Sequence, residues 1–385
     1  MNKRKICIVV GSRANYSSIK AVMSAVERHP DLELQLVVAA SAVLDRYGSV
    51  VDIIKRDGFT PVGHLFMLVE GETPATMAKS TGLGLIELPT MFERLQPDAV
   101  VTVGDRFETM ATALAASYMN IPLAHTMGGE VSGNIDECIR HAITKFAHVH
   151  FPACQDAADR ILKLGEEPDR VHLVGCPRMD IVAEILANPA PIGDALEKEG
   201  VGAHFNADEP FILVSQHPVT SEYGAGEEQI SETLHAVRET GMQALVLWPN
   251  ADAGAEDVAR GIRKYREKNR EAPFHYVKTL PPEVYMPLMA KTHCLVGNSS
   301  SGIREGAFIG TPAVNVGTRQ TNRQRGRNIV DSSYDRKSIL KAIESRLALN
   351  GRIASEPIYG DGKAGPRIAD IMAKIEFNLD KRITY

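Results

Sequence analysis

The sequence predicts an α/β protein with two doubly wound domains, and three observations lead to this prediction. Short apolar, β-branched runs alternate with segments whose apolar residues recur at helical spacing. Each run ends in a polar or glycine-containing loop, as strands do at the ligand-binding edge of an open parallel sheet. The alternation pauses at residues 188–210, where proline, glycine and charged residues accumulate, and then begins again.

Length and composition fit this class. The chain has 385 residues, 44% of them hydrophobic, which is enough for two cores of ordinary size. A formal net charge of −5 argues against a general nucleic-acid-binding protein. Five cysteines without a Cys-x-x-Cys pair favour a reducing compartment, so we expect a cytoplasmic protein. The apolar run at residues 6–10 is too short for a signal peptide or a membrane span, and no membrane partner is expected.

The first half of the chain begins with a predicted strand at residues 5–10 and a helix that ends near Arg28. The small polar turn between them, residues 11–18, suits an anion, and Arg13 and Ser17 are candidate phosphate contacts. The turn matches neither GxGxxG nor a Walker loop, so an ordinary βα turn is the alternative. The further predicted strands are 34–40, 98–103, 121–125, 148–151 and 171–174, and the further helices are 42–56, one ending near 95, 106–118, 135–146 and 155–164.

Residues 97–145 hold the densest group of candidate catalytic side chains. Asp105 directly follows one buried strand, Glu130 lies in the loop after the next, and Asp136 lies in the first turn of the helix that follows. Because the carboxyl ends of parallel strands meet at one edge of a sheet, we expect these three carboxylates to share one crevice. The alternative is that Asp105 and Asp136 only cap helices, a common role for aspartate.

The second half repeats the alternation with predicted strands at 211–215, 243–248, 274–278, 293–297 and 312–316. His217 follows the first of these strands and Asn250 the second. Ser299 and Ser300 open a helix after the fourth, where hydroxyls and backbone N–H groups would hold a diphosphate without a metal. A serine-rich helix cap is the alternative. Two further candidates belong to this region, Glu305 for the ribose hydroxyls and Arg319 for an anion.

Several long motifs resemble, in order and spacing, those of the hydrolysing UDP-N-acetylglucosamine 2-epimerases of sialic acid biosynthesis and their bacterial relatives. They are GSRANYSSI, GDRFETMATALAASYMNIPLAH, GGEVSGNIDECIRHAITK, SQHPVT, WPNAD, GNSSSGIRE and GTPAVNVGTRQ, and they extend to about residue 330. The resemblance implies a GT-B fold with two Rossmann-like domains and the active site in the cleft between them. It also implies a homodimer or homotetramer, and neither cofactor nor metal is expected.

In this fold the expected domains are residues 1–185, with the catalytic carboxylates, and residues 208–360, with the nucleotide site. Residues 361–385 are expected to form a helix that returns to the first domain. By motif match, the catalytic positions are Asp105, Asp136 and His217. The nucleotide-binding positions are Arg13, Ser17, Arg106, Asn250, Ser299, Ser300, Glu305 and Arg319.

The chain departs from the family pattern at Met127. Many members have His-Ile-Glu-Gly-Gly-Glu where this chain has His-Thr-Met-Gly-Gly-Glu at residues 125–130. A thioether cannot transfer a proton, so either Glu130 or Asp136 takes over this role or the substrate differs. This version of the loop resembles that of the branch of the family that acts on UDP-N,N′-diacetylbacillosamine, in the biosynthesis of legionaminic acid. Its 6-methyl and second acetamido groups suit Met127 as a substrate-binding residue.

The expected reaction first expels UDP, after which a carboxylate removes the C2 proton to leave a glycal and water adds across the double bond. The products are the free manno-configured sugar and UDP. The same reaction on UDP-N-acetylglucosamine is the main alternative, and a GDP-linked sugar also stays open. Three different functions stay open as well, namely a non-hydrolysing epimerase, a GT-B glycosyltransferase and a catalytically inactive nucleotide-sugar sensor.

Overall fold

The computed structural model describes residues 3–45, 48–71, 73–131, 135–192, 196, 200–249, 254–278, 280–349 and 351–385. The chain forms two compact units, which we describe separately. Unit 1 consists of Met1–Ile181 and Tyr359–Tyr385, and unit 2 consists of Val182–Ile358. Both units are α/β with predominantly parallel sheets, so the predicted doubly wound class is confirmed. Within the described residues, no helix has the length and apolar character that a membrane span requires.

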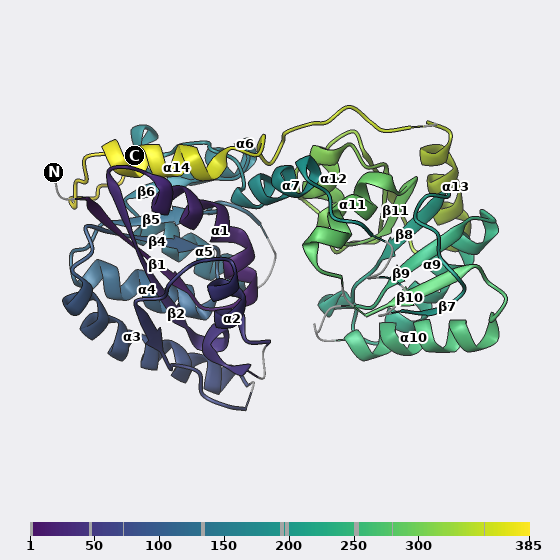
Figure 1. The fold of residues 1–385 in the computed structure, drawn as a ribbon, viewed down its shortest axis with the longest axis horizontal. Coiled ribbons are helices and arrows are strands. Elements are labelled where there is room, and N and C mark those ends of the chain that lie inside the picture. Colours follow the sequence, from purple (N-terminus) through teal and green to yellow (C-terminus); the bar gives the residue numbers. More distant parts are fainter. Residues whose placement is uncertain are drawn as a thin grey trace. The chain divides into compact units, whose positions relative to one another are not determined.

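Unit 1 contains a six-stranded parallel sheet in the order β3-β2-β1-β4-β5-β6 (Figure 1). Its strands are β1 (Arg4–Val10), β2 (Leu32–Ala39), β3 (Gly63–Leu65), β4 (Ala99–Val103), β5 (Leu123–Thr126) and β6 (Val149–Phe151). Its helices are α1 (Arg13–Arg28), α2 (Val50–Arg56), α3 (Pro74–Leu95), α4 (Phe107–Tyr118), α5 (Ile135–Phe146), α6 (Gln155–Lys163) and α14 (Ala364–Lys374), with short 3₁₀ turns η1 (Ala40–Val43) and η3 (Pro168–Arg170).

A hydrophobic core lies on each face of this sheet. The alternation of β4 sends Val101 and Val103 into the core that α1, α2 and α14 cover, while Val100 enters the core beneath α3, α4 and α5. Both faces are therefore covered, which explains why the strands read as continuous apolar runs rather than as alternating ones.

Unit 2 contains a seven-stranded sheet in the order β13-β12-β11-β8-β9-β10-β7, in which only β7 is antiparallel to its neighbour. Its strands are β7 (Gly200–Gly202), β8 (Phe211–Ser215), β9 (Gln243–Leu247), β10 (Phe274–Val277), β11 (Cys294–Gly297), β12 (Ala313–Val316) and β13 (Ile329–Ser332). Its helices are α9 (Gly226–Glu239), α10 (Ala255–Lys268), α11 (Pro282–Lys291), α12 (Ser300–Ile309) and α13 (Arg336–Leu347), with the 3₁₀ turn η4 (Thr220–Glu222). Helix α7 (Pro177–Ala187) begins in unit 1 and ends in unit 2.

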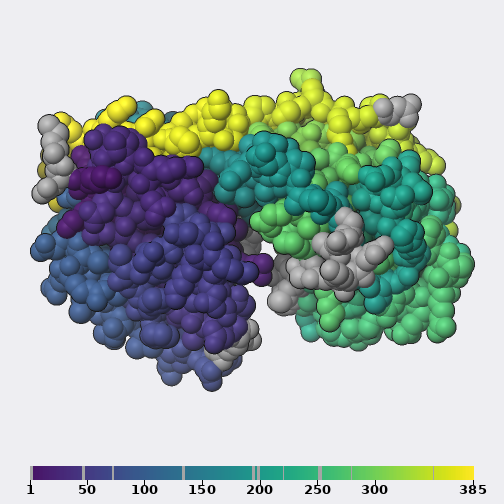
Figure 2. All heavy atoms as spheres, in the orientation of Figure 1, coloured from purple at the N-terminus to yellow at the C-terminus, as the bar shows by residue number. Residues whose placement is uncertain are grey.

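The helix near the end of the sequence, α14, packs on α1 in unit 1. In Figure 2 the yellow residues of this segment lie against the purple residues of the first strand and helix. The Asp180 carboxylate caps α14 by accepting hydrogen bonds from the backbone N–H of Ala364 at 2.9 Å and Gly365 at 2.7 Å. A Cβ at Gly365 would lie 2.6 Å from the carbonyl oxygen of Ala21, so the close approach of α14 to α1 requires glycine.

A buried ion cluster also joins the last residues to unit 1. The Glu166 carboxylate, 2% exposed, accepts hydrogen bonds from Lys145 Nζ at 2.6 Å and His150 Nε2 at 3.0 Å, and it pairs with Lys381 Nζ at 2.7 Å. Lys381 Nζ also donates to the carbonyl oxygen of Thr144 at 2.9 Å, at the end of α5. Burial alone would raise the pKa of Glu166, but these three donors outweigh it and hold the pKa at about 2.

Some predicted elements need correction. Residues 171–174 were predicted to form a strand, but they form only an isolated bridge between Val171 and His150. The helix predicted at 42–56 is shorter, because η1 precedes it and α2 begins at Val50. Three short strands were not predicted, β3, β7 and β13, and β7 lies inside the predicted linker.

Candidate active site

The site in unit 1 lies where the strand order reverses. From β1 the chain continues to β2 and β3 on one side and to β4, β5 and β6 on the other, so the carboxyl ends of β1 and β4 form a topological switch point. The parallel register pairs Ile8 with Val101, which brings the turn after β1 and the turn after β4 to the same level of the edge. The first turn carries Gly11, Ser12 and Arg13, and the second carries Asp105 and Arg106.

Asp105 is held by a cation, Arg140, that was not among the predicted site residues. Its carboxylate forms an ion pair with Arg140 of α5, a side chain that is 8% exposed. Arg140 also donates a hydrogen bond to the carbonyl oxygen of Glu130, so one guanidinium joins the ends of β4 and β5. The N-cap of α4 is Arg106, without a side-chain cap, so Asp105 does not serve as the cap of that helix. Asp136 lies on α5 one turn before Arg140 and is half-buried.

The loop after β5 is fixed by two arginines. Arg160 donates to the carbonyl oxygen of Gly129, and Arg140 donates to that of Glu130, whose side chain is buried. Met127 has a left-handed backbone with φ +59°, a conformation in which a residue other than glycine is strained. Its half-buried side chain packs against the core beneath α1 and α14. An apolar residue at this position therefore fits the wall on which it lies.

The turn before Asp105 is fixed from β5. Burial lowers the pKa of His125 to about 3, so its imidazole is neutral at physiological pH. Its Nε2 lies 2.7 Å from the carbonyl oxygen of Gly104 and must carry the proton, because a carbonyl only accepts. The Gly104 N–H in turn donates to the carbonyl oxygen of Thr126 at 3.1 Å. These two bonds fix the backbone that carries the Asp105 carboxylate.

The three remaining candidates of unit 1 lie at the starts of α1 and α4. Arg13 is exposed at the first residue of α1, and the Ser17 hydroxyl donates to the carbonyl oxygen of Ala14 at 3.0 Å. The Arg106 side chain is 47% exposed, and its Nε donates to Oε1 of Glu108 at 3.0 Å. Glu108, another residue not singled out from the sequence, is 3% exposed and lies against Gly11.

We expect Gly11→Ala to lower the free energy of unfolding by about 1–3 kcal/mol, as overpacking of a filled site does. A Cβ at Gly11 would lie 2.2 Å from Cγ of Glu108, a contact that the well-packed start of α4 cannot relieve freely. Urea unfolding of Gly11→Ala, Glu108→Ala and the double variant measures this. The double variant should be destabilised by less than the sum of the single variants, and an additive result would contradict the contact.

The site in unit 2 has the same topology. Its strand order reverses between β8 and β11, and Asn298, 1% exposed, joins the turns after these two strands. The Asn298 side chain accepts from the His217 N–H at 2.7 Å and donates to the His217 carbonyl oxygen at 2.8 Å. Its own carbonyl oxygen accepts from Arg319 Nη1 at 3.4 Å and from Gln320 Nε2 at 2.8 Å. Asn298 therefore gathers His217 and Arg319 at one edge.

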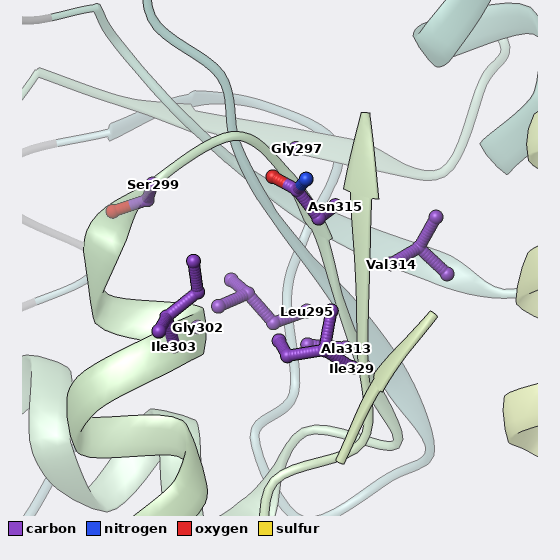
Figure 3. A pocket seen from close by; sticks show the side chains of 9 residues that line it. All are labelled: Leu295, Gly297, Ser299, Gly302, Ile303, Ala313, Val314, Asn315 and Ile329. Carbon is purple, nitrogen blue, oxygen red and sulfur yellow. The ribbon is translucent and has the colours of Figure 1, made fainter. Parts of the chain in front are cut away.

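The start of α12 carries the predicted serines. Ser299 is the N-cap of α12, and its hydroxyl accepts from the Ser301 N–H at 3.3 Å. Ser300 is the first residue of α12 and is half-buried, and Glu305 lies buried one turn further on. Figure 3 shows the hollow beneath this helix start, which is lined mainly by apolar side chains, with Ser299 at its edge. A diphosphate would therefore contact the helix start and not enter the hollow.

The structure thus brings Asp105 and the Glu130 loop together in unit 1, and His217, Ser299 and Arg319 together in unit 2. Asn250 lies outside the described residues. In the described part of the chain, no three His, Cys, Asp or Glu side chains are grouped as metal ligands. Arg140 and Asn298 were both inside the family-like motifs, and Arg140 follows Asp136 at the helical spacing of four, a signal that could have identified it.

The chain is similar to known proteins in sequence and in fold. Residues 24–373 match the family model described as UDP-N-acetylglucosamine 2-epimerase. The chain is 33% identical, over 97% of its length and 96% of the relative's, to the UDP-N,N′-diacetylbacillosamine 2-epimerase (hydrolyzing) of Legionella pneumophila. It is 29% identical, over 94% of its length and 91% of the relative's, to the UDP-N-acetylglucosamine 2-epimerase of Neisseria meningitidis. A crystal structure of the UDP-GlcNAc 2-epimerase from Neisseria meningitidis bound to UDP-GlcNAc has the same fold, with a TM-score of 0.78 at 17% identity, covering 96% of this chain and 100% of that one.

Proposed function

This chain belongs to the UDP-N-acetylglucosamine 2-epimerase family, and from that premise we propose that it is a hydrolysing 2-epimerase acting on UDP-N,N′-diacetylbacillosamine. The products would be UDP and 2,4-diacetamido-2,4,6-trideoxymannose, a precursor of legionaminic acid. The observation that carries the choice of sugar is Met127, an apolar side chain on an apolar wall at a position where many family members have glutamate. The 33% identical relative that bears this name supports the same choice.

The proposed reaction begins with departure of the nucleotide, because the C2 hydrogen of a 2-acetamido sugar is not acidified by an adjacent carbonyl. The C1–O bond breaks and its electron pair leaves with UDP, so an oxocarbenium ion develops at C1. Ser299 and Ser300 at the start of α12, with Arg319 and His217, are the groups we assign to the departing diphosphate. A helix N-terminus and cations stabilise negative charge that grows as the bond breaks.

A carboxylate then removes the C2 proton, and the electrons of the C2–H bond form the C1–C2 double bond of a glycal. Water adds its hydroxyl to C1, and C2 receives a proton on the opposite face, which gives the manno configuration. We assign these transfers to Asp105 and Asp136, with Glu130 as the further candidate acid. Asp105 suits this work because Arg140 and the fixed Gly104 turn hold its carboxylate in one place.

Proton NMR in deuterated water tests the proposal, with UDP-N,N′-diacetylbacillosamine and UDP-N-acetylglucosamine as separate substrates and no acceptor. We expect UDP and the free manno sugar with deuterium at C2 from the first substrate. The same products from UDP-N-acetylglucosamine alone would establish the alternative, which the 29% identical relative of that name favours. An intact nucleotide sugar with deuterium at C2 would indicate a non-hydrolysing epimerase, and no change with either substrate would contradict both epimerase reactions.

Replacement of Met127 tests the choice of sugar directly. We expect Met127→Glu to shift the ratio of kcat/KM for the two substrates about tenfold or more toward UDP-N-acetylglucosamine. A carboxylate on this wall should disfavour the 6-methyl group of the bacillosamine substrate, whereas a 6-hydroxyl can hydrogen-bond to it. Met127→Leu, which keeps the wall apolar, is the matched control and should leave the ratio within about threefold. An unchanged ratio in Met127→Glu would remove Met127 from the specificity argument.

A further inference from the structure

Glu108 lies in the first turn of α4, and its side chain is almost completely buried at the switch point between β1 and β4. We propose that Glu108 is a positioning residue for the nucleotide, which orients Arg106 toward a phosphate of UDP and keeps that phosphate away from the backbone turn at the start of α1. The inference rests on the proposed function, because it takes UDP as the ligand and Arg106 as one of its contacts.

The first part of the inference follows from the pair of Arg106 and Glu108. Oε1 of Glu108 accepts from Nε of Arg106 at 3.0 Å, and the exposures of the two side chains differ, at 3% for Glu108 and 47% for Arg106. One partner is therefore fixed inside the protein while the other extends to the surface. A guanidinium held through Nε directs its two Nη groups outward, and these are the groups that bind a phosphate in a bidentate manner. The guanidinium carbon also lies 5.8 Å from the ring of Phe107, which further limits its movement.

The second part follows from the position of Glu108 beside the start of α1. In open α/β sheets the turn after the first strand commonly binds a phosphate through backbone N–H groups. In this chain the Glu108 side chain lies against that turn, since a Cβ at Gly11 would be only 3.1 Å from its carboxyl carbon. The Ser12 hydroxyl there caps α1 by accepting from the Asn15 N–H at 3.2 Å. Because the Glu108 side chain fills the space beside this turn, a phosphate at this edge would contact the side chains of Arg13 and Arg106 and not the backbone of the turn.

A purely structural role for Glu108 would predict different behaviour. Burial raises the pKa of the Glu108 carboxyl, and the Arg106 guanidinium and the Ser12 hydroxyl lower it only in part. A buried acid in the first turn of a helix also stabilises that helix. If Glu108 did only this, its replacement would change the stability of the chain, and any effect on UDP binding would not depend on Arg106. Coupling between the two side chains in UDP binding therefore separates the two roles.

The experiment is a double-mutant cycle on UDP binding, measured by isothermal titration calorimetry with the full chain. Glu108→Met keeps the length of the side chain but removes the carboxyl acceptor, and we expect it to weaken UDP binding about tenfold. Arg106→Ala should weaken binding at least as much, and the double variant should bind no more weakly than Arg106→Ala. Glu108→Gln, whose amide oxygen still accepts from Nε, is the matched control and should bind within about threefold of the natural chain. Thermal unfolding verifies that each variant is folded.

Additive effects of Glu108→Met and Arg106→Ala would overturn the inference, and so would a Glu108→Gln variant that binds as weakly as Glu108→Met. If Glu108→Met does not fold, Glu108→Leu, which also lacks the carboxyl acceptor, replaces it in the cycle, and the same criteria apply. A natural chain that binds UDP but shows additive variants contradicts only this inference. A natural chain that does not bind UDP contradicts the proposed function and this inference together.

Discussion

Asp105→Asn is expected to lower kcat about a thousandfold while changing the Kd for UDP by less than about threefold. The amide keeps the shape of the side chain but cannot take a proton from C2. Its loss of charge also leaves Arg140 without its ion-pair partner, so the stability of the variant must be measured alongside its turnover. The rate of UDP release at saturating substrate gives kcat, and calorimetry with UDP alone gives the Kd.

Asp98→Asn is the matched control for this prediction, because Asp98 lies just before the first residue of β4, at the end opposite to Asp105. Its carboxylate accepts from the Lys5 N–H at 2.7 Å and lies far along the strand from the carboxyl edge. We expect Asp98→Asn to retain normal kcat. Near-normal turnover in Asp105→Asn would remove Asp105 from the proton transfers and leave Asp136 and Glu130 as the candidates.

The largest effect on stability is expected for Glu166→Gln, which should lower the free energy of unfolding at pH 7 by about 3–5 kcal/mol. In the natural chain Lys381, Lys145 and His150 all contact the buried Glu166 carboxylate. The substitution replaces that carboxylate by a neutral amide, so these three side chains lose their anionic partner. Urea unfolding of the natural chain and the variant measures the difference. Glu167→Gln is the matched control, because the neighbouring Glu167 is 44% exposed and contacts Arg170 only at 3.9 Å.

The difference in free energy of unfolding between the natural chain and Glu166→Gln should depend on pH. The folded pKa of Glu166, about 2, lies below the ordinary value for glutamate. Its ionised form therefore stabilises the folded chain fully above about pH 4.5, and this contribution, about 3 kcal/mol, is lost as the pH falls toward 2. The difference between the natural chain and Glu166→Gln should accordingly shrink as the pH is lowered from 5 to 3. A difference that stays constant over this range would show that the carboxylate charge does not carry the stabilisation.

The predicted fold depended on strands that are buried on both faces, and those strands were found within one or two residues. Phe211–Ser215 is entirely apolar except at its end, and such a short apolar run is typical of a strand that is buried on both faces. The strands that were missed are short and lie toward the edges of the sheets, such as β7 with the sequence Gly-Val-Gly and β13, which is only half-buried. Their pairing comes from the neighbouring strand, β10 or β12, and not from any local pattern.

The sequence could identify side chains of the candidate site that can transfer a proton or bind a ligand. It could not identify a side chain that only holds another residue in place. Asp105 and His217 stood out because each follows a strand at the edge where open α/β sheets bind their ligands. Asn298 did not, because its partner His217 is distant in the chain. The bonds between Asn298 and His217 join residues 81 positions apart. Such pairs become visible only when the fold brings two strand ends together.

The return of α14 to unit 1 has a consequence for the order in which the chain folds during synthesis. Ile368 and Met372 belong to the same core as Val101 and Val103, yet the ribosome makes the whole of unit 2 between them. At 5–20 residues per second, the part of this core that α14 covers stays exposed for about 10–35 s, although α1 and α2 are already made. Unit 2 is continuous in sequence and can complete its core before unit 1 does. Unit 1 without α14 is therefore the species that a chaperone would meet, and the apolar surface that α14 later covers is where misassembly would begin.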